Sequence, residues 1–497
     1  MYEKFLPLKE YIEKEISRKV VLKIAKDYDA AIEAVGTGKA HLAYLDPSAY
    51  CEAKQRFGVI SLAKAVRAGS STYKSVIVTR KDSTISRIID VKGKRLALGN
   101  SWSSSSSLIP LVMFKELGIG INDFASVDYL EHEDRIALSV LTGRHDAGGL
   151  SQGVAIKYVK DGLRILKTSE AIPQYSLCAW SGLPEEVRNR IRKAVLSISG
   201  DRHAELIKGM KDITGFSSTE DRDFDVVRVM IKNLTGKNYI EYGRDSVKIA
   251  ILPLYSAITL FERFDPLMRY LSKKTGHEFK LVIPKDFEEF FEIIGQGKVE
   301  FSYSNPYIYI QLAEKGLLKA FANTVLKETG DIFRGIIITH MDSSIEKLND
   351  LRGKNVMIVS FRSAGGFLAQ KLYLYENGID VLKDLKLIDG KRQEEVILNV
   401  YGKKADAGFV RESALDVLRE EIDLGRIRVL ARTPYIANWP FAATKKADEK
   451  ITKLVRNSLL ELRDRETLSA AQITGFKPAD DSDFDNLRAW IGKHENK

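Results

Sequence analysis

A run of serines is the part of the sequence best suited to hold a small anion. Ser103–Ser107 follow an apolar segment, Leu96–Gly99, and precede an amphipathic stretch. This order predicts a strand, a loop and a helix, and a helix start has unpaired backbone N–H groups and partial positive charge. Ser103, Ser104 and Ser105 would add hydroxyl donors there, which suits a phosphate-like or carboxylate anion. The alternative is a low-complexity linker.

Tyrosines form a second group of candidate ligand-binding residues. Tyr44 and Tyr50 flank an Asp-Pro turn that follows a short apolar segment, and Tyr303 stands in the same way before an Asn-Pro turn. Tyr73 directly precedes another apolar segment. Each residue could offer a hydroxyl and a ring face to a ligand. For Tyr44 and Tyr50, a place in the hydrophobic core is an equal alternative.

Ionisable side chains complete the candidate set. Asp146 and Asp406 each close a turn before Ala-Gly, where an aspartate either caps the turn or accepts a hydrogen bond from a ligand. His132 could bind an anion or a metal, but no metal-binding motif accompanies it. Arg334 follows Phe333, and a guanidinium at that place could hold a carboxylate with two parallel hydrogen bonds.

Catalytic and cofactor motifs are missing from the sequence. It contains no Gly-x-Ser-x-Gly elbow, no Walker loop and no glycine-rich dinucleotide fingerprint. We therefore expect neither an enzyme nor a bound cofactor. An enzyme with a pocket serine as nucleophile is the less favoured alternative, and His132 is the nearest candidate base for it.

Composition narrows the class further. The chain has 497 residues, 44% hydrophobic and 29% charged, which is typical of a globular protein. Its net charge of +10 is scattered without a block of like charges, so nucleic acid is not an expected partner. Two cysteines cannot form a disulfide framework. No apolar segment is long enough to span a bilayer, and Met1–Phe5 lack a signal-peptide core, so no export signal is expected.

The same unit occurs twice along the chain. Ile213–Phe216 return as Ile473–Phe476, 260 positions later, and further motifs keep this offset to within one residue. A repeat of this length indicates two tandem domains rather than a solenoid. We expect domains at 1–240 and 246–497.

Short apolar segments alternate with helical patterns in each copy, which predicts an α/β fold with mainly parallel sheets. In such sheets, ligands sit beyond the carboxyl ends of the strands. The second copy opens with an apolar strand, Val247–Pro253, that has no counterpart in the first copy, so a gap is expected in the first sheet. In the first copy the predicted strands are Val20–Ala25, Leu42–Leu45, Ser75–Thr79 and Arg95–Gly99.

These motifs together resemble the phosphate-, phosphite- and phosphonate-binding proteins of ABC transporters. The resemblance rests on Gly38–Tyr44, Pro47–Tyr50, Tyr73–Val78, Asp90–Lys94 and the serine run, which stands where the family has Ser-Thr-Ser-Gly. It covers nearly the whole chain, twice. It implies two tandem type II periplasmic-binding-protein modules, each of two lobes joined by a hinge. The inserted lobes are expected at about 75–168 and 335–432.

The resemblance also implies a function. The chain would be a periplasmic or otherwise extracytoplasmic solute-binding protein that captures a small anionic or zwitterionic ligand, similar to phosphate, phosphite or a phosphonate. Its partner would be an ABC-transporter permease or a membrane sensor. A ligand-sensing module of a signalling system is the alternative.

Residue by residue, Ser103, Ser104 and Ser105 match the anion-gripping motif of that family. Tyr73 and Tyr44 match pocket tyrosines, and His132 and Asp146 match more loosely. Several departures from the family pattern predict that the two copies are not equivalent. The second copy would bind another acid, with Ser363, Gly365, Tyr303, Arg334 and Asp406 as the candidates, or it would bind no ligand and have a structural role. These departures are Asp46 and Asn305 in place of a glycine before proline, and Phe333, Ala364 and Gly365 in place of hydroxyl-bearing residues.

Overall fold

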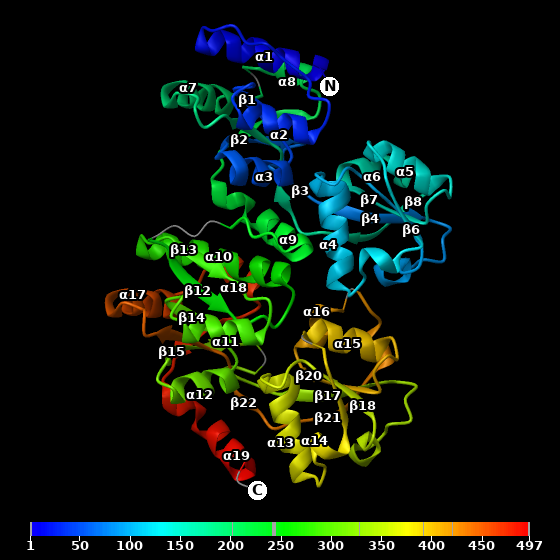
Figure 1. Ribbon diagram of the computed structural model, residues 1–497, viewed down its shortest axis with the longest axis vertical. Coiled ribbons are helices and arrows are strands. Elements are labelled where there is room, and N and C mark those ends of the chain that lie inside the picture. The colour runs from blue at the N-terminus through cyan, green and yellow to red at the C-terminus, as the bar shows by residue number, and fades with distance from the viewer. Residues whose placement is uncertain are drawn as a thin grey trace. The chain divides into compact units, whose positions relative to one another are not determined.

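The computed structural model describes residues 2–200, 202–240, 245–327, 329–390, 392–419 and 421–495. Contacts divide the chain into two compact units, Met1–Ile240 (unit 1) and Glu241–Lys497 (unit 2) (Figure 1). Each unit consists of an outer lobe and an inserted lobe, and each lobe has its own sheet.

The outer lobe of unit 1 contains a four-stranded sheet in which all neighbouring strands are antiparallel. Helices α1 and α7 cover this sheet, and Leu8, Ile12, Leu62, Ile191 and Val195 are buried together in its core. The strands in spatial order are β1 (Leu42–Leu45), β10 (Ser176–Ala179), β2 (Ile60–Arg67) and β11 (Ile213–Ser217). The helices are α1 (Tyr2–Ile16), α2 (Tyr28–Gly36), α3 (Pro47–Phe57), α7 (Glu185–Leu196), α8 (Ala204–Gly209) and α9 (Asp225–Thr235).

The inserted lobe of unit 1 begins with β4 and ends with β8, at the residues that the sequence predicts. Its strands in spatial order are β6 (Ser126–Tyr129), β5 (Arg95–Leu98), β7 (Ala147–Ser151), β4 (Ser75–Arg80) and β8 (Leu163–Thr168). Its helices are α4 (Ile109–Glu116), α5 (Glu133–Leu141) and α6 (Gln152–Val159). A two-stranded pair, β3 (Thr72–Tyr73) and β9 (Ile172–Pro173), connects the lobes.

Unit 2 repeats this plan with a larger outer sheet. The six outer strands in spatial order are β13 (Phe279–Val282), β12 (Val247–Ile251), β14 (Phe301–Tyr303), β23 (Pro440–Thr444), β15 (Leu318–Val325) and β24 (Gly475–Pro478). The five inserted strands are β19 (Lys386–Asp389), β18 (Asn355–Ile358), β20 (Ala407–Arg411), β17 (Gly335–His340) and β21 (Ile427–Arg432). The connecting pair is β16 (Ile332–Phe333) with β22 (Ile436–Ala437).

The helices of unit 2 follow the same order as those of unit 1. In the outer lobe they are α10 (Ala257–Thr275), α11 (Phe287–Gly295), α12 (Pro306–Glu314), α17 (Glu449–Leu460), α18 (Arg465–Ala471) and α19 (Asp485–Glu495). In the inserted lobe they are α13 (Ala369–Glu376), α14 (Val381–Asp384), α15 (Gln393–Tyr401) and α16 (Ala414–Val417).

The predicted α/β architecture of two tandem modules is confirmed. Its sheets are less parallel than expected: the inserted sheets and the outer sheet of unit 2 are mixed, and the outer sheet of unit 1 is antiparallel. Parallel pairs surround β5, β12 and β18. The other strand pairs are antiparallel, among them those of β23, which re-enters the outer sheet after the connecting pair.

The predicted gap in the outer sheet of unit 1 is present, and it has a second consequence. In unit 2, β12 pairs on one side with β14 and on the other with β13. Unit 1 has no counterpart of β12 among its described residues, so β1 is an edge strand. The prediction of a strand at Val20–Ala25 is wrong: this segment is irregular, and Val21 and Ile24 are 65% and 51% exposed. With the offset of 259 it corresponds in sequence to β13, and β13 pairs with β12, which has no counterpart among the described residues of unit 1.

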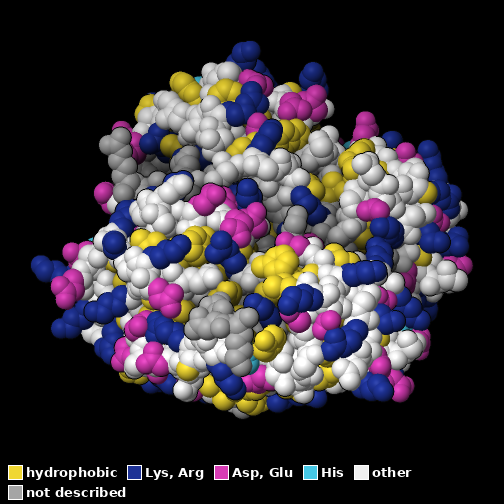
Figure 2. Space-filling model, turned by 60° about the horizontal axis from the view of Figure 1, so that its bottom comes forward, with side chains coloured by type: hydrophobic (Ala, Val, Ile, Leu, Met, Phe, Trp, Pro, Cys, Tyr) yellow, Lys and Arg dark blue, Asp and Glu magenta, His cyan; other side chains and the backbone are white. Residues whose placement is uncertain are grey.

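The surface agrees with the scattered charge of the sequence. On the face shown in Figure 2, basic and acidic side chains are interspersed in small groups, with no broad patch of either sign. Among the described residues, no helix combines the length and apolar character that crossing a membrane requires.

Candidate functional site

The serine loop of unit 1 is a buried, tightly folded helix start. Ser104–Leu108 form a π-helical turn that leads into α4, and Ser103 caps it by accepting a hydrogen bond from the Ser106 amide at 3.3 Å. Ser103–Ser107 are all buried. Gly99, which follows β5, must be glycine because a Cβ atom there would lie 1.9 Å from the Ser106 hydroxyl. The predicted strand, loop and helix therefore bring Ser103, Ser104 and Ser105 together.

The donors of Ser104 are occupied by a carboxylate of the protein itself. Asp46 follows β1 in the outer lobe, and its carboxylate accepts the Ser104 amide at 3.2 Å and also the Ser104 hydroxyl. The same carboxylate accepts the Ser48 amide at 3.0 Å, and the Ser48 hydroxyl oxygen lies 3.1 Å from it. Asp46 is 1% exposed. Burial raises the pKa of Asp46, while the bonds from Ser104 and Ser48 oppose that rise.

A second carboxylate lies on the neighbouring serine. Glu133, the first residue of α5, accepts the Ser105 hydroxyl at 2.6 Å, the Ser151 amide at 3.0 Å and the Ser151 hydroxyl at 2.5 Å. His132, predicted to face the ligand, lies one residue earlier at the helix cap and is exposed. Because side chains at a helix start turn by about 100° per residue, a shift of one position exchanges the half-buried Glu133 for the exposed His132. An acidic residue in the first turn of a predicted helix was the sequence feature that could have identified Glu133.

Aromatic rings surround this loop on the outer-lobe side. Tyr73 lies in the connecting strand β3, and its buried hydroxyl makes no well-formed hydrogen bond within the described residues. Its ring lies 6.4 Å from that of Tyr175. Tyr175 in turn stacks at 5.4 Å on Tyr44, whose hydroxyl accepts a bond from Arg67 at 3.1 Å. Tyr28, which the sequence did not single out, has its pKa raised to about 12 by burial and by Asp46.

Three predicted residues lie away from this group. The Tyr50 ring is fully buried against Phe224, and its hydroxyl donates to Asp221 at 2.6 Å, so it belongs to the core of the outer lobe. Asp146 binds the amide and the guanidinium of Arg95, at the start of β5. Asp406 accepts the Asn355 amide at 2.8 Å, at the start of β18. The serine loops follow the other ends of these strands, so both aspartates are turn residues at the opposite sheet edge.

The corresponding loop of unit 2 is closed by an aromatic ring. Ser363 caps a π-helical turn, Ala364–Leu368, by accepting the Gly366 amide at 3.0 Å. A Cβ atom on Gly365 would lie 2.6 Å from the Phe333 ring, so the ring occupies the space beside the loop. Asn305 accepts bonds from its own helix α12 and donates to the Arg362 carbonyl at 3.2 Å.

Arg334 was predicted to bind a ligand, but its guanidinium forms an ion pair within the protein. Its Nε and Nη2 donate to the two oxygens of Glu412 at 2.6 and 3.0 Å, and its guanidinium lies 4.8 Å from the centre of the Tyr435 ring. This ion pair lowers the pKa of Glu412. The guanidinium is neutralised by the chain and does not line the cavity of unit 2.

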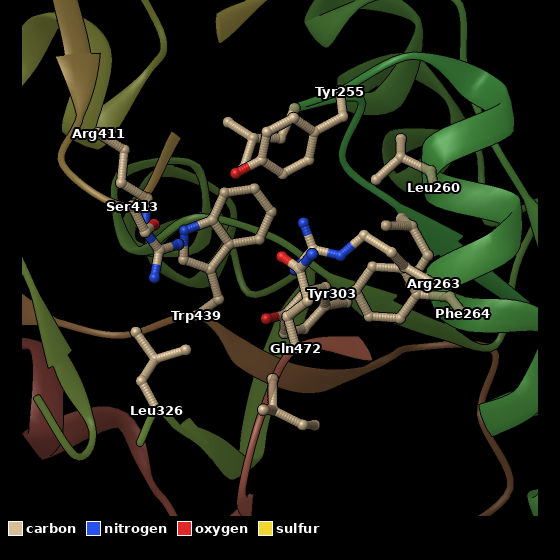
Figure 3. A pocket seen from close by; sticks show the side chains of 13 residues that line it. Tyr255, Leu260, Arg263, Phe264, Tyr303, Leu326, Arg411, Ser413, Trp439 and Gln472 are labelled. Atoms are coloured by element: carbon tan, nitrogen blue, oxygen red, sulfur yellow. The ribbon is translucent and has the colours of Figure 1, made fainter. Parts of the chain in front are cut away.

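The cavity of unit 2 lies between its lobes and is lined by two other arginines. Arg411 ends β20 in the inserted lobe, while Arg263 projects from α10 in the outer lobe (Figure 3). Trp439 and Tyr255 stand between them in this view. The space open to the centre of a water molecule is about 60 Å³. The lining residues are Ile251, Leu254, Tyr255, Leu260, Arg263, Phe264, Tyr303, Leu326, Arg411, Ser413, Trp439, Gln472 and Ile473.

Neither cavity arginine has an acidic partner in the described part of the chain. Arg411 is 7% exposed; it donates to the Asn438 side chain at 3.2 Å and stacks 4.2 Å from the Phe333 ring centre. Arg263 donates to the Ala471 carbonyl at 2.9 Å and stacks 4.9 Å from the Tyr255 ring centre. The Nε atoms of both arginines and the Trp439 Nε1 are buried, and no described residue forms a hydrogen bond with them. Burial lowers the pKa of Arg411, and Arg263 adds to this effect.

The sequence analysis did not identify Arg411 or Arg263, and for Arg411 the reason is its position in the repeat. Arg411 takes the place that Ser151 has in unit 1, because Gln393 accepts its amide at 2.9 Å as Glu133 accepts that of Ser151. Tyr303, which was predicted, contributes to the cavity wall and packs 5.2 Å from Trp439. An arginine at the end of an inserted strand was the available signal, but nothing in the sequence marks it as unpaired.

Comparison with known proteins gives two matches to one family model. That model describes the periplasmic substrate-binding protein of phosphonate ABC transporters, and it matches residues 1–224 and again 249–484. Among curated relatives, the chain is 23% identical over 270 residues to the phosphate-import protein PhnD of Mycolicibacterium smegmatis, covering 49% of this chain and 84% of that protein. It is 24% identical over 265 residues to the tetrathionate sensor histidine kinase TtrS of Salmonella typhimurium, covering 50% of this chain and 44% of the kinase.

Two solved structures are similar over different lengths. A binding component of an ABC phosphonate transporter from Pseudomonas aeruginosa matches with a TM-score of 0.47 and 18% identity, covering 50% of this chain and 86% of that one. The periplasmic domain of BvgS from B. pertussis matches with a TM-score of 0.34 and 14% identity, covering 94% of this chain and 84% of that one. With both of its halves matched by one family model, the chain belongs to the phosphonate-binding family of periplasmic substrate-binding proteins of ABC transporters, as a tandem of two copies.

Proposed function

We propose that this solute-binding protein holds a small acid in the cavity of unit 2 and presents it to a membrane partner. The observation that supports the proposal is Arg411, a guanidinium buried beside a cavity, which no carboxylate of the described residues neutralises. An unpaired buried charge costs free energy, which a bound anion would offset. Arg263 supplies a second guanidinium from the opposite lobe.

The cavity sets the size and shape of the acid. About 60 Å³ of the cavity is open to the centre of a water molecule. A compact carboxylate or phosphonate suits a space of this size. Trp439 Nε1 is a further donor, while Leu260 and Phe264 give the walls an apolar character. The ligand we expect therefore carries one acidic group on a small apolar body.

The contacts of the serine loop in unit 1 argue against the alternative of an enzyme with a serine nucleophile. The hydroxyls of Ser104 and Ser105 donate to Asp46 and Glu133, in a buried loop. His132, the candidate base, is exposed. We therefore propose binding without catalysis.

The proposal has two versions, which differ in the membrane partner that receives the ligand-bound protein. Membership in the family favours delivery to an ABC-transporter permease. The match to part of the sensor kinase TtrS favours the alternative, in which ligand binding is signalled rather than followed by uptake. Both versions need the same ligand site.

Differential scanning calorimetry of the full chain tests the site. We would screen inorganic phosphate, methylphosphonate, acetate, pyruvate and benzoate at equal ionic strength. A ligand that binds the folded state raises the melting temperature of the unit that holds it. We expect at least one acid to raise a single transition, and Arg411→Gln to abolish that shift.

Arg334→Gln is the matched control, because it removes a guanidinium that lies outside the cavity in the same unit. We expect it to keep the shift. If Arg334→Gln abolished the shift and Arg411→Gln kept it, the original sequence prediction would be right and this proposal wrong. If no acid shifted either transition, the proposal would also fail.

A further inference from the structure

The serine loop of unit 1 already holds an anionic group, which is the carboxylate of a residue of the same chain. The Asp46 carboxylate takes the amide and hydroxyl of Ser104, at a helix start where backbone N–H groups attract negative charge. It reaches them from the outer lobe, across the boundary to the inserted lobe. We propose that Asp46 serves as an internal ligand: it excludes free anions from the loop and keeps unit 1 closed without a solute.

Other contacts across the same boundary reinforce the closure. The Ser48 hydroxyl donates to the Trp102 carbonyl at 2.6 Å, and the Ser48 amide donates to the Ser104 hydroxyl at 3.0 Å. The Trp102 indole N–H donates to Asp29 at 3.0 Å. Asp29, Asp46 and Ser48 belong to the outer lobe, while Trp102 and Ser104 belong to the inserted lobe. The two lobes are therefore joined through the loop that would otherwise hold the solute.

Two further hydroxyls of the loop also have acceptors within the protein. Ser105 donates to Glu133, and the Ser106 hydroxyl donates to that of Ser103 at 2.7 Å. An incoming anion would meet two carboxylates and would have to displace one of them. Like charges in a buried site repel strongly, so anion selectivity at this loop is set by Asp46 and secondarily by Glu133.

Unit 2 provides an internal comparison. Asn305 stands in the position of Asp46, before the proline that starts the matching helix. Its side-chain oxygen accepts the amides of Tyr307 and Ile308, and its amide group donates to the Arg362 carbonyl. Asn305 therefore caps its helix without occupying the Ser363 turn, and the internal ligand is specific to unit 1.

Replacing Asp46 by glycine tests the proposal, because it removes the carboxylate and leaves the serine loop intact. The full chain would carry Arg411→Gln as well, so that binding in unit 2 does not contribute. Hydrogen–deuterium exchange of the segment 102–108 reports closure, and titration with inorganic phosphate or methylphosphonate reports binding. With Asp46 present, we expect exchange to be unchanged by either anion. In Asp46→Gly, we expect exchange to rise about tenfold or more and to fall again with phosphate, as expected for local opening that a ligand reverses.

Asp46→Asn keeps the size of the side chain and its cap of α3, so it covers the case in which the glycine variant does not fold. We expect intermediate exchange in this variant and measurable phosphate binding. Asn305→Gly in unit 2 is the control and should leave exchange at 102–108 unchanged. The proposal is overturned if phosphate, methylphosphonate or an aminophosphonate protects 102–108 while Asp46 is in place. It is overturned equally if both variants keep the original exchange and bind no anion. These outcomes are read in unit 1 and are independent of the acid site in unit 2.

Discussion

Arg411 and Arg334 show how one residue type takes two roles within a single unit. Arg334 is paired with Glu412, whereas Arg411 is buried with only neutral partners among the described residues. Replacing a buried charge by an apolar side chain of similar length is often stabilising. We therefore expect Arg411→Met to raise the melting temperature of ligand-free unit 2 by about 2–4 °C, corresponding to ~1 kcal/mol, and to remove its response to acids.

Arg334→Met is the comparison for this prediction, measured by the same calorimetric scans. Loss of a partly exposed ion pair changes stability by about 0–1 kcal/mol, so we expect a small decrease and an intact response to acids. A lower melting temperature for ligand-free Arg411→Met would show that its bond to Asn438 outweighs the cost of the buried charge.

At this scale, the sequence predicted types of residue better than their partners. Ser103, Ser104 and Ser105 do gather at a helix start, and Tyr303 does line the cavity of unit 2. The sequence could not predict that Asp46 would reach Ser104, since the two are 58 positions apart and lie in different lobes. A burial pattern also cannot separate a paired arginine from an unpaired one, because pairing depends on the side chains of other elements.

At the scale of elements, the first prediction concerns an ion pair at the start of two neighbouring strands. Asp146 bonds to Arg95 where β5 and β7 begin, and this bond lowers the pKa of Asp146 to about 2. In the unfolded chain an aspartate titrates near 3.8. A carboxyl with a lowered pKa stabilises the fold above its unfolded pKa, and that stabilisation is lost as pH falls through the range from about 4 to 2.

We therefore expect Asp146→Asn to lower the stability of unit 1 by about 1–2 kcal/mol at pH 7, allowing for partial exposure of the pair. The difference from the original protein should shrink as pH falls below 4 in denaturant titrations. Asp406→Asn is the control, because its partner at the same place is the Asn355 amide rather than an arginine, and its cost should be smaller. Equal costs for the two variants would contradict this explanation.

The open edge of β1 leads to a second prediction about elements. Pro7 in α1 and Pro266 in α10 are 259 positions apart, as are Tyr44 and Tyr303, so residues 246–259 correspond to the positions just before Met1. Grafting residues 246–259 in front of Met1 should add a strand beside β1, as β12 lies beside β14. We expect the melting temperature of unit 1 to rise.

The same graft with Ile249→Pro is the control for that experiment, since proline cannot donate to a sheet ladder. Equal melting temperatures for the two grafts would show that the added segment does not pair with β1. The error at Val20–Ala25 has the same origin. Its apolar residues have strand character, but a strand needs a neighbour, and a local pattern does not reveal that the neighbour is missing.

On the scale of the molecule, the duplication was predictable because an offset near 260 recurs in many motifs. The sequence also predicted that the two units differ in their candidate binding residues, and the contacts of their two loops do differ. The sequence favoured the serine loop of unit 1 as the anion site, but Asp46 occupies that loop, and the cavity of unit 2 contains two arginines without an acidic partner among the described residues. That reversal depends on contacts between lobes, which no single segment encodes.

The stoichiometry of acid binding tests this division of roles most directly. Titration calorimetry would be performed on the full chain with the acid that gives the largest shift in melting temperature. We expect one site per chain, which is lost in Arg411→Gln and retained when Ser104 and Ser105 are both replaced by alanine. Two sites per chain, or a single site that survives Arg411→Gln and is lost in the serine variant, would contradict it.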